Sequence, residues 1–106
     1  MWWLSMSLVG LALIGVSDAC PEQCRCDGRK RVYCNNRNFS SVPNNIPFDT
    51  KVLHLQDNEL KNSDILDSVL GKLTQLESLK LYNNKLDRIP KLNSNYLREV
   101  HFNKNR

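Results

Sequence analysis

The sequence predicts an α/β solenoid, a fold in which short coils of chain stack on one another. Its main support is a regular spacing of apolar residues. Similar segments open at intervals of 21, 26 and 21 residues, at Val32, Leu53, Leu79 and Val100. They read LHLQDNEL at 53–60, LKLYNNKL at 79–86 and VHFNKN at 100–105. Two further features agree with an extracellular array of coils: an apolar leader at the start and a cluster of cysteines after it.

The first element is an apolar run over residues 4–16, followed by Ser17-Asp18-Ala19. Small residues at these positions are typical of a secretory signal, so we expect residues 1–19 to be removed after Ala19. The run is too short to span a bilayer. A lipoprotein signal with Cys20 as the lipidated residue is the alternative, and Ser17 disfavours it because such signals usually carry a large aliphatic residue there. We expect a secreted chain without a membrane span, in the extracellular matrix or extracellular space.

The second element, over residues 20–47, is expected to be a cysteine-rich cap with the first short coil. All four cysteines of the chain lie here, at Cys20, Cys24, Cys26 and Cys34. In a secreted chain they indicate two disulfides, with three pairings possible. Zinc is the alternative, and the spacing lacks the paired C-x-x-C motifs of most zinc sites. A disulfide-bonded segment would cover the apolar end of the first coil.

The third element, over residues 48–106, is expected to contain the repeats, with the last one truncated. Alternating apolar residues predict a short strand in each coil. The residues expected inside are Leu53, Leu55, Leu60, Leu76, Leu79, Leu81, Leu86, Leu97, Val100 and Phe102, with Val32, Cys34, Phe39 and Val42 in the first coil. Asparagine recurs after each strand, at Asn58, Asn84 and Asn105, where a carboxamide can satisfy turn donors and acceptors together. This is the leucine-rich-repeat pattern.

The return segments of the coils differ in length. Prolines near Val42, Ile46 and Ile89 predict extended returns in the two 21-residue coils. The 26-residue coil has room for a short helix that Ser63 or Asp64 caps and Gly71 ends. Its expected buried face is Ile65, Leu66, Val69 and Leu70.

The residues between the inward leucines are expected to face out of the sheet and to bind a ligand. Four rows result: Val52, Ser78 and Glu99; His54, Lys80 and His101; Gln56, Tyr82 and Asn103; Asp57, Asn83 and Lys104. This surface is polar, mixed in charge and carries one aromatic side chain. It suits a large hydrated partner better than a small apolar ligand.

The same surface could be interpreted as a metal or anion site at His54, Lys80 and His101. Lysine does not coordinate metal at neutral pH, and no carboxylate clearly completes a shell, so we favour three solvated side chains. No serine, histidine and acid converge, and no glycine-rich phosphate loop is present. We therefore expect no enzyme activity, no metal and no cofactor.

Two surface features remain. Arg29-Lys30-Arg31, with Arg25 nearby, could hold sulfated glycans or an acidic protein patch, although a solvated turn is the favoured interpretation. Nucleic acid is excluded as a partner by the expected secretion. Asn38-Phe39-Ser40 is the sole N-glycosylation sequon. No Ser-Gly dipeptide is present, which argues against an attached glycosaminoglycan chain.

The chain resembles the extracellular leucine-rich-repeat proteins, and among them the small leucine-rich proteoglycans, most of all their podocan-like members. The segment from Cys20 to Cys34, the run VPNNIPFDT at 42–50 and the alternating coil lengths carry this resemblance. It implies the pairs Cys20–Cys26 and Cys24–Cys34, and a curved solenoid with parallel strands on its concave side. It further implies a matrix role in which the concave face binds collagen or growth factors.

Two other functions compete with this one. The chain could be the N-terminal part of an immune-type recognition receptor ectodomain, which would share the cap and the coils. It could also be an inactive truncated fragment, because family members carry more coils and a second cysteine cap.

Overall fold

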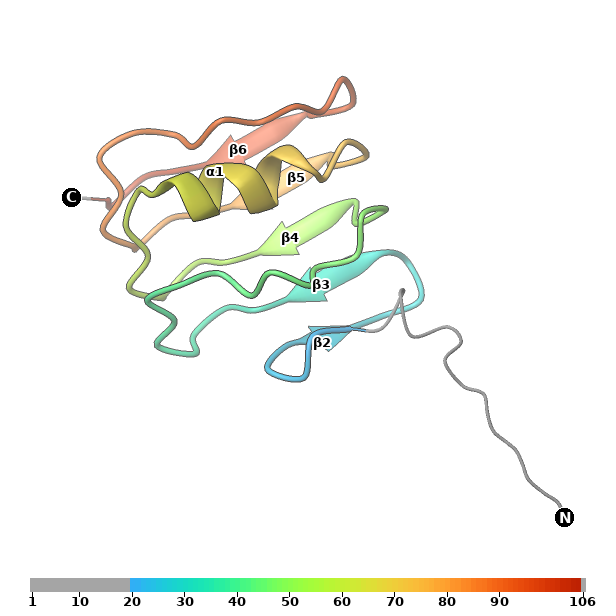
Figure 1. The fold of residues 1–106 in the computed structure, drawn as a ribbon, viewed down its shortest axis with the longest axis horizontal. Helices are drawn as coiled ribbons and strands as arrows, with labels where there is room; N and C mark the ends of the chain where they lie inside the picture. Colours follow the sequence, from blue (N-terminus) through green and yellow to red (C-terminus); the bar gives the residue numbers. More distant parts are fainter. Residues whose placement is uncertain (1–19, 106) are drawn as a thin grey trace, which may run out of the picture.

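The computed structural model describes residues 20–105, and the expected signal at 1–19 lies outside the described residues. Within this range the chain forms a five-stranded sheet and one helix. In order these are β2 (Arg25–Cys26), β3 (Arg31–Tyr33), β4 (Val52–His54), α1 (Asp64–Gly71), β5 (Ser78–Lys80) and β6 (Glu99–His101). The strands lie in chain order across the sheet (Figure 1). β2 is antiparallel to β3, and all other neighbours are parallel.

The register of the parallel strands confirms the predicted spacing of the coils. Val32 pairs with Leu53, Leu53 with Leu79, and Leu79 with Val100. These residues point to the side of the sheet on which α1 lies, and Figure 1 shows α1 crossing in front of β5. We call this the helix side and the opposite one the sheet face. No helix among residues 20–105 is long and apolar enough to cross a membrane.

The core is a column of leucines, one set from each coil. Seven of the leucines expected inside have at most 1% of their surface exposed: Leu53, Leu55, Leu60, Leu76, Leu79, Leu81 and Leu86. Phe39, Leu97, Val100 and Phe102 were expected inside as well but are only half-buried. The last three belong to the last described coil, which packs against β5 alone within the described range. Leu73 and Thr50 are fully buried although the sequence pattern did not single them out.

Helix α1 begins and ends where the sequence predicts, with two differences. Ser63 is the N-cap, and its Oγ accepts a hydrogen bond from Leu66 N at 3.0 Å. Gly71 is the last helical residue, and it does not adopt a left-handed conformation. The next residue, Lys72, also has right-handed backbone (φ −84°). The prediction that Ile65 is buried is wrong, since 63% of its surface is exposed. At 100° per residue, Ile65 lies about 90° from the centre of the stripe formed by the buried helix residues.

The cap is a hairpin held by two disulfides. Cys20 is bonded to Cys26 and Cys24 to Cys34, which is the pairing that the family resemblance implies. Cys20–Cys26 joins the segment before β2 to β2 itself, whereas Cys24–Cys34 joins the β2 region to the first coil, and Cys34 is completely buried. The Cys20–Cys26 disulfide uses the sulfur that a lipoprotein signal would require for its lipid, which favours the secretory signal.

Each recurring asparagine joins its own coil to the preceding one. Asn84 Oδ1 accepts from Leu60 N at 3.0 Å, and its Nδ2 donates to Leu55 O at 3.0 Å and Leu81 O at 3.1 Å. Asn58 and Asn105 make equivalent contacts in the neighbouring coils. Asn84 and Asn58 are buried. The three side chains therefore form the expected ladder, which we call the asparagine ladder.

A residue with left-handed backbone comes directly before each asparagine of the ladder. These residues are Asp57 (φ 62°), Asn83 (φ 59°) and Lys104 (φ 61°), and Asn36 (φ 56°) occupies the same place in the first coil. Asn and Asp tolerate this conformation, whereas lysine gains no local hydrogen bond from it. The turn is therefore strained only in the last described coil.

Replacing Asn84 should destabilise the fold strongly. Asn84→Ala leaves a buried amide and buried carbonyls from two coils without partners, so we expect the free energy of unfolding to fall by about 3 kcal/mol. Urea denaturation followed by circular dichroism measures it. Asn93→Ala, at an exposed position, is the matched control and should change stability by less than about 0.5 kcal/mol. Equal effects of both substitutions would contradict the ladder's structural role.

Relieving the left-handed lysine should stabilise the fold. Left-handed backbone costs a side-chain-bearing residue about 1–2 kcal/mol, whereas glycine loses less than this in added unfolded-state entropy. Lys104→Gly should therefore raise the free energy of unfolding by about 0.5–1 kcal/mol. Lys91→Gly, where φ is not positive, is the control and should lower stability in the same denaturation experiment. A loss of stability at both positions would show that the turn is unstrained.

Candidate binding surface on the sheet face

In two of the four predicted rows, the residues pair directly with one another across neighbouring strands. Val52 pairs with Ser78 and Ser78 with Glu99, while His54 pairs with Lys80 and Lys80 with His101. The other two rows lie where the chain leaves the strands. Backbone hydrogen bonds join these turns, from Asp57 N to Tyr82 O and from Asn83 N to Asn103 O, each at 3.1 Å. The predicted residues are therefore brought together on one face, which continues past the strand ends.

Two of these residues are not available to a ligand. Ser78 and Gln56 have only 7% and 8% of their surface exposed, so the expectation that they face solvent is wrong. Ser78 Oγ donates to Glu99 Oε2 at 3.3 Å, and Gln56 Nε2 lies 3.5 Å from His54 Nδ1. Gln56 Oε1 has no hydrogen-bond partner among the described residues.

Strands β2 and β3 also contribute to this face, which sequence reasoning missed. Arg31 and Tyr33 continue the first two rows, because Arg31 pairs with Val52 and Tyr33 with His54. The rings of Tyr33 and His54 are stacked with centroids 4.6 Å apart, and Arg25 Cζ lies 4.6 Å from the centroid of Tyr33. The alternation of side chains on either side of the inward Val32 could have predicted that Arg31 and Tyr33 face outward. The cysteines instead led to the assignment of this segment to the cap.

The charges on the sheet face fall into paired and unpaired groups. Glu99 lies 2.8 Å from His101 Nε2, and hydrogen bonds from His101 and Ser78 lower the pKa of its carboxyl. The pKa of His54 is also lowered, first by burial and then by the positive charges of Lys80 and Arg31. His54 is therefore held neutral between basic neighbours, while Glu99 stays ionised.

The basic run after Cys26 is a turn whose charges are largely compensated. Arg31 Nε lies 2.7 Å from Asp27 Oδ2, and Lys30 Nζ lies 2.8 Å from Asp49 Oδ2. Lys30 has φ 65°, and Arg29 is exposed. This geometry agrees with the solvated turn that was favoured over a glycan site. In residues 20–105 no three His, Cys, Asp or Glu side chains are grouped to hold a metal ion.

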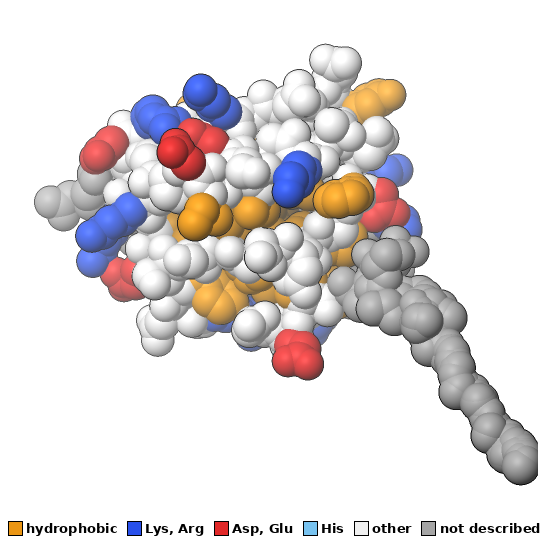
Figure 2. Space-filling view, in the orientation of Figure 1, with side chains coloured by type: hydrophobic (Ala, Val, Ile, Leu, Met, Phe, Trp, Pro, Cys, Tyr) orange, Lys and Arg blue, Asp and Glu red, His pale blue; other side chains and the backbone are white. Residues whose placement is uncertain are grey.

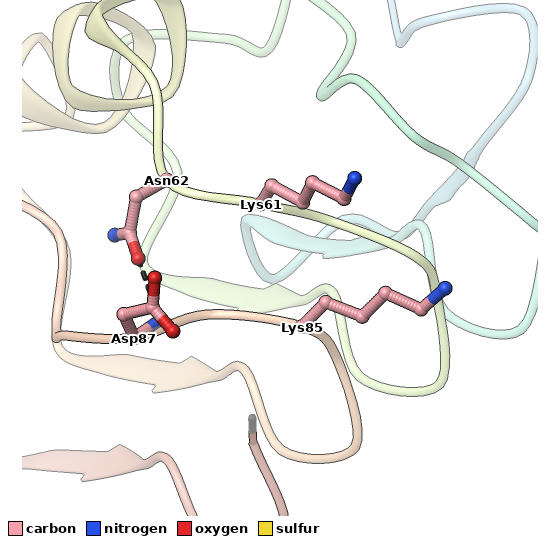
Figure 3. A pocket seen from close by; sticks show the side chains of 4 residues that line it. All are labelled: Lys61, Asn62, Lys85 and Asp87. Atoms are coloured by element: carbon pink, nitrogen blue, oxygen red, sulfur yellow. Dashed lines mark hydrogen bonds between the residues drawn. The ribbon is translucent and has the colours of Figure 1, made fainter.

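An open hollow of about 480 Å³ lies beside the sheet, between the returns of two coils (Figure 3). It is lined by Lys61, Asn62, Lys85 and Asp87. Asn62 Oδ1 accepts from Asp87 N at 2.7 Å, so this side chain joins the two coils. Lys85 Nζ lies 2.8 Å from Glu59 Oε1. The hollow is therefore lined by polar side chains, and Asn62 and Lys85 are engaged in contacts between coils.

The helix side presents a different surface. Figure 2 shows apolar side chains in the middle of this side, with charged groups around them. Two coils are joined there by Asp67, which accepts from Arg88 Nη2 at 3.1 Å and Lys91 N at 3.0 Å. These hydrogen bonds lower the pKa of the Asp67 carboxyl. The polar groups of this side thus hold coils together, whereas those of the sheet face are more available.

The stacked coils, the asparagine ladder and the disulfide cap are features of leucine-rich-repeat proteins. Known relatives are of the same kind. The chain is 40% identical over 86 residues to leucine-rich repeat transmembrane protein FLRT2 of Rattus norvegicus, and 39% identical over 85 residues to that of Homo sapiens. It is 44% identical over 62 residues to asporin of Bos taurus.

These matches cover most of the chain but little of each relative. The rat FLRT2 match spans 81% of this chain and 13% of FLRT2, and the asporin match spans 58% of this chain and 16% of asporin. A solved octameric complex of Latrophilin 3, Unc5D and the leucine-rich repeats of FLRT2 contains a similar chain. It has a TM-score of 0.66 and 34% identity, over 81% of this chain and 26% of that one. No protein-family model matches the chain.

Removing the charge of Lys80 should raise the pKa of His54. Lys80 is the nearest basic residue in register with His54, and its positive charge disfavours the protonated ring. We expect Lys80→Gln to move the titration of the His54 ring, followed by its NMR signals, to higher pH. Lys72→Gln, on an exposed residue after α1, is the control and should leave this titration unchanged. No movement with Lys80→Gln would mean that burial and Arg31 account for the lowered pKa without Lys80.

Proposed function

We propose that this chain is a secreted, non-enzymatic binding module that holds another extracellular protein on its sheet face. The observation that carries this proposal is the in-register alignment of five strands, which presents one continuous polar surface. Its side chains are mixed in charge and include stacked aromatic rings, which are typical features of a protein interface. No catalytic group converges there among the described residues.

The nature of the partner is part of the proposal. The matrix interpretation names collagen or a growth factor, with the coils as part of a curved solenoid of the podocan-like type and the sheet face on its concave side. The sequence similarity to asporin, which covers 58% of this chain, supports this interpretation. Sulfated glycans are a lesser candidate, because Lys30 and Arg31 of the basic run are already paired with carboxylates.

A second candidate function follows from the other relatives. FLRT2 is a transmembrane protein by name, and its leucine-rich repeats occur in a complex with Latrophilin 3 and Unc5D. By analogy, this chain would be part of a cell-surface recognition protein that binds the extracellular regions of other receptors. Both candidates use the same surface, so one set of variants tests them together.

A glycan placed on the sheet face should block the partner. Lys80→Asn with Tyr82→Thr creates a sequon in the middle of this face, and the attached glycan would cover the neighbouring rows. We expect binding to immobilised collagen, growth factors, or the Latrophilin 3 and Unc5D ectodomains to fall at least about tenfold for whichever of them the unmodified chain binds. Surface plasmon resonance with the full-length protein measures this.

The control for this experiment uses a native threonine. Lys72→Asn alone creates a sequon that ends at Thr74, after α1 and away from the sheet face. Its glycan should leave binding unchanged. Binding that survives the sheet-face glycan, or that is lost equally with the control, would contradict the proposed function. Intact mass before and after deglycosylation verifies that each added sequon, and the native one at Asn38, is occupied.

A further inference from the structure

We propose that four residues in one row of the sheet face form a subsite for a short acidic segment of the protein partner. The residues are Arg25, Tyr33, His54 and Lys80, which we call the basic row. This inference rests on the proposed function and names the chemistry that the sheet face recognises. It does not depend on which extracellular protein supplies the segment.

The basic row is continuous across four strands. Arg25 pairs with Tyr33, Tyr33 with His54, and His54 with Lys80. Residues paired in this way point to the same face of a sheet, and neighbouring strands are about 4.8 Å apart. The row is therefore about 15 Å long, since it crosses three such intervals.

The side chains in the middle of the row are ordered before any ligand arrives. The ring of Tyr33 lies between its two neighbours, stacked on His54 at 4.6 Å and with Arg25 Cζ 4.6 Å from its centroid. Tyr33 and His54 are half-buried. A guanidinium held on an aromatic face loses less freedom on binding than a fully mobile one, which favours recognition of an anionic group.

The two cations of the row form no ion pair within the described chain. Three other basic residues of this region do, since Arg31 pairs with Asp27, Lys30 with Asp49 and His101 with Glu99. By contrast, neither Arg25 nor Lys80 lies within 4.0 Å of a carboxylate among residues 20–105. The charge of Lys80 instead acts without an ion pair, since it disfavours protonation of His54 and contributes to the lowered pKa of the Glu99 carboxyl. Two carboxylates from a partner could pair with Arg25 and Lys80 at the two ends of the row.

The surroundings of the row favour a protein segment over a sulfated polysaccharide. Carboxylates lie on two sides of it, with Asp57 in the turn after β4 and Glu99 on β6. A polymer with negative charge along its whole length would be repelled where it leaves the row. An extended peptide places alternate side chains about 7 Å apart, so two or three carboxylates match the length of the row. The peptide residues on either side of these carboxylates can be neutral or basic, which avoids repulsion by Asp57 and Glu99.

The test is binding of two synthetic peptides to the full-length protein, followed by NMR. The first peptide alternates glutamate and threonine over eight residues, and the second has glutamine in place of glutamate. We expect the glutamate peptide alone to shift the ring signals of His54, and its affinity to fall as salt rises. Equal binding of the glutamine peptide, or no binding of either, would overturn the proposal.

Charge variants locate the site. Arg25→Gln with Lys80→Gln should weaken binding of the glutamate peptide by about tenfold or more. Arg29→Gln with Lys72→Gln removes one arginine and one lysine elsewhere and should weaken it less than about twofold. Lys80→Gln alone provides a milder variant if the double variant melts without cooperativity. An equal loss for the row variant and the control would overturn the proposal.

Two further arms separate the alternatives. A heparin-derived oligosaccharide that binds the same row more tightly than the glutamate peptide would overturn the choice of a protein segment. Binding of the natural partner is then measured for the Arg25→Gln, Lys80→Gln variant and for the variant with the sheet-face glycan. If the glycan blocks binding and the row variant does not, the acidic subsite is wrong while the proposed function stands. If neither affects binding, the proposed function itself fails.

Discussion

The asparagine ladder is the constraint on which the rest of this structure depends. Asn84 is buried and bonds backbone groups of its own coil and of the preceding one. Water cannot replace these bonds, because the groups lie behind the leucine column. The left-handed residue before each asparagine turns the chain so that its carboxamide points inward. Strand register follows from this turn, and the rows of the sheet face follow from the register.

The cap has a structural and a functional consequence at once. Its disulfides cover the end of the leucine column, where Cys34 is buried, and a domain this small benefits from such cross-links. The same hairpin carries Arg25 and brings it over Tyr33 on the sheet face. An element that closes the core at one end therefore also extends the candidate binding surface beyond the regular coils.

The sequence predicted those features that follow from periodicity, and it failed where neighbours decide. Leucine spacing placed Leu53, Leu79 and the ladder correctly, because each repeats at the same point of every coil. Alternation also told which side of the sheet Ser78 and Gln56 face. It could not tell that both are buried, since this depends on side-chain contacts, which Ser78 makes with Glu99 and Gln56 with His54. Ile65 failed for a related reason: an eight-residue helix buries only the centre of its apolar stripe.

The two sides of the sheet use polar groups in opposite ways, and this difference locates the function. On the helix side and in the returns, Asp67 and Asn62 bond the backbone of the next coil, so their capacity is used within the fold. On the sheet face, Arg25 and Lys80 have no carboxylate partner in the described chain, although charged residues are common nearby. These two charges form no ion pair between coils, and the charge of Lys80 disfavours protonation of His54. Arg25 and Lys80 lie in one row on either side of the stacked Tyr33 and His54 rings, which is where a partner's carboxylates can pair with them.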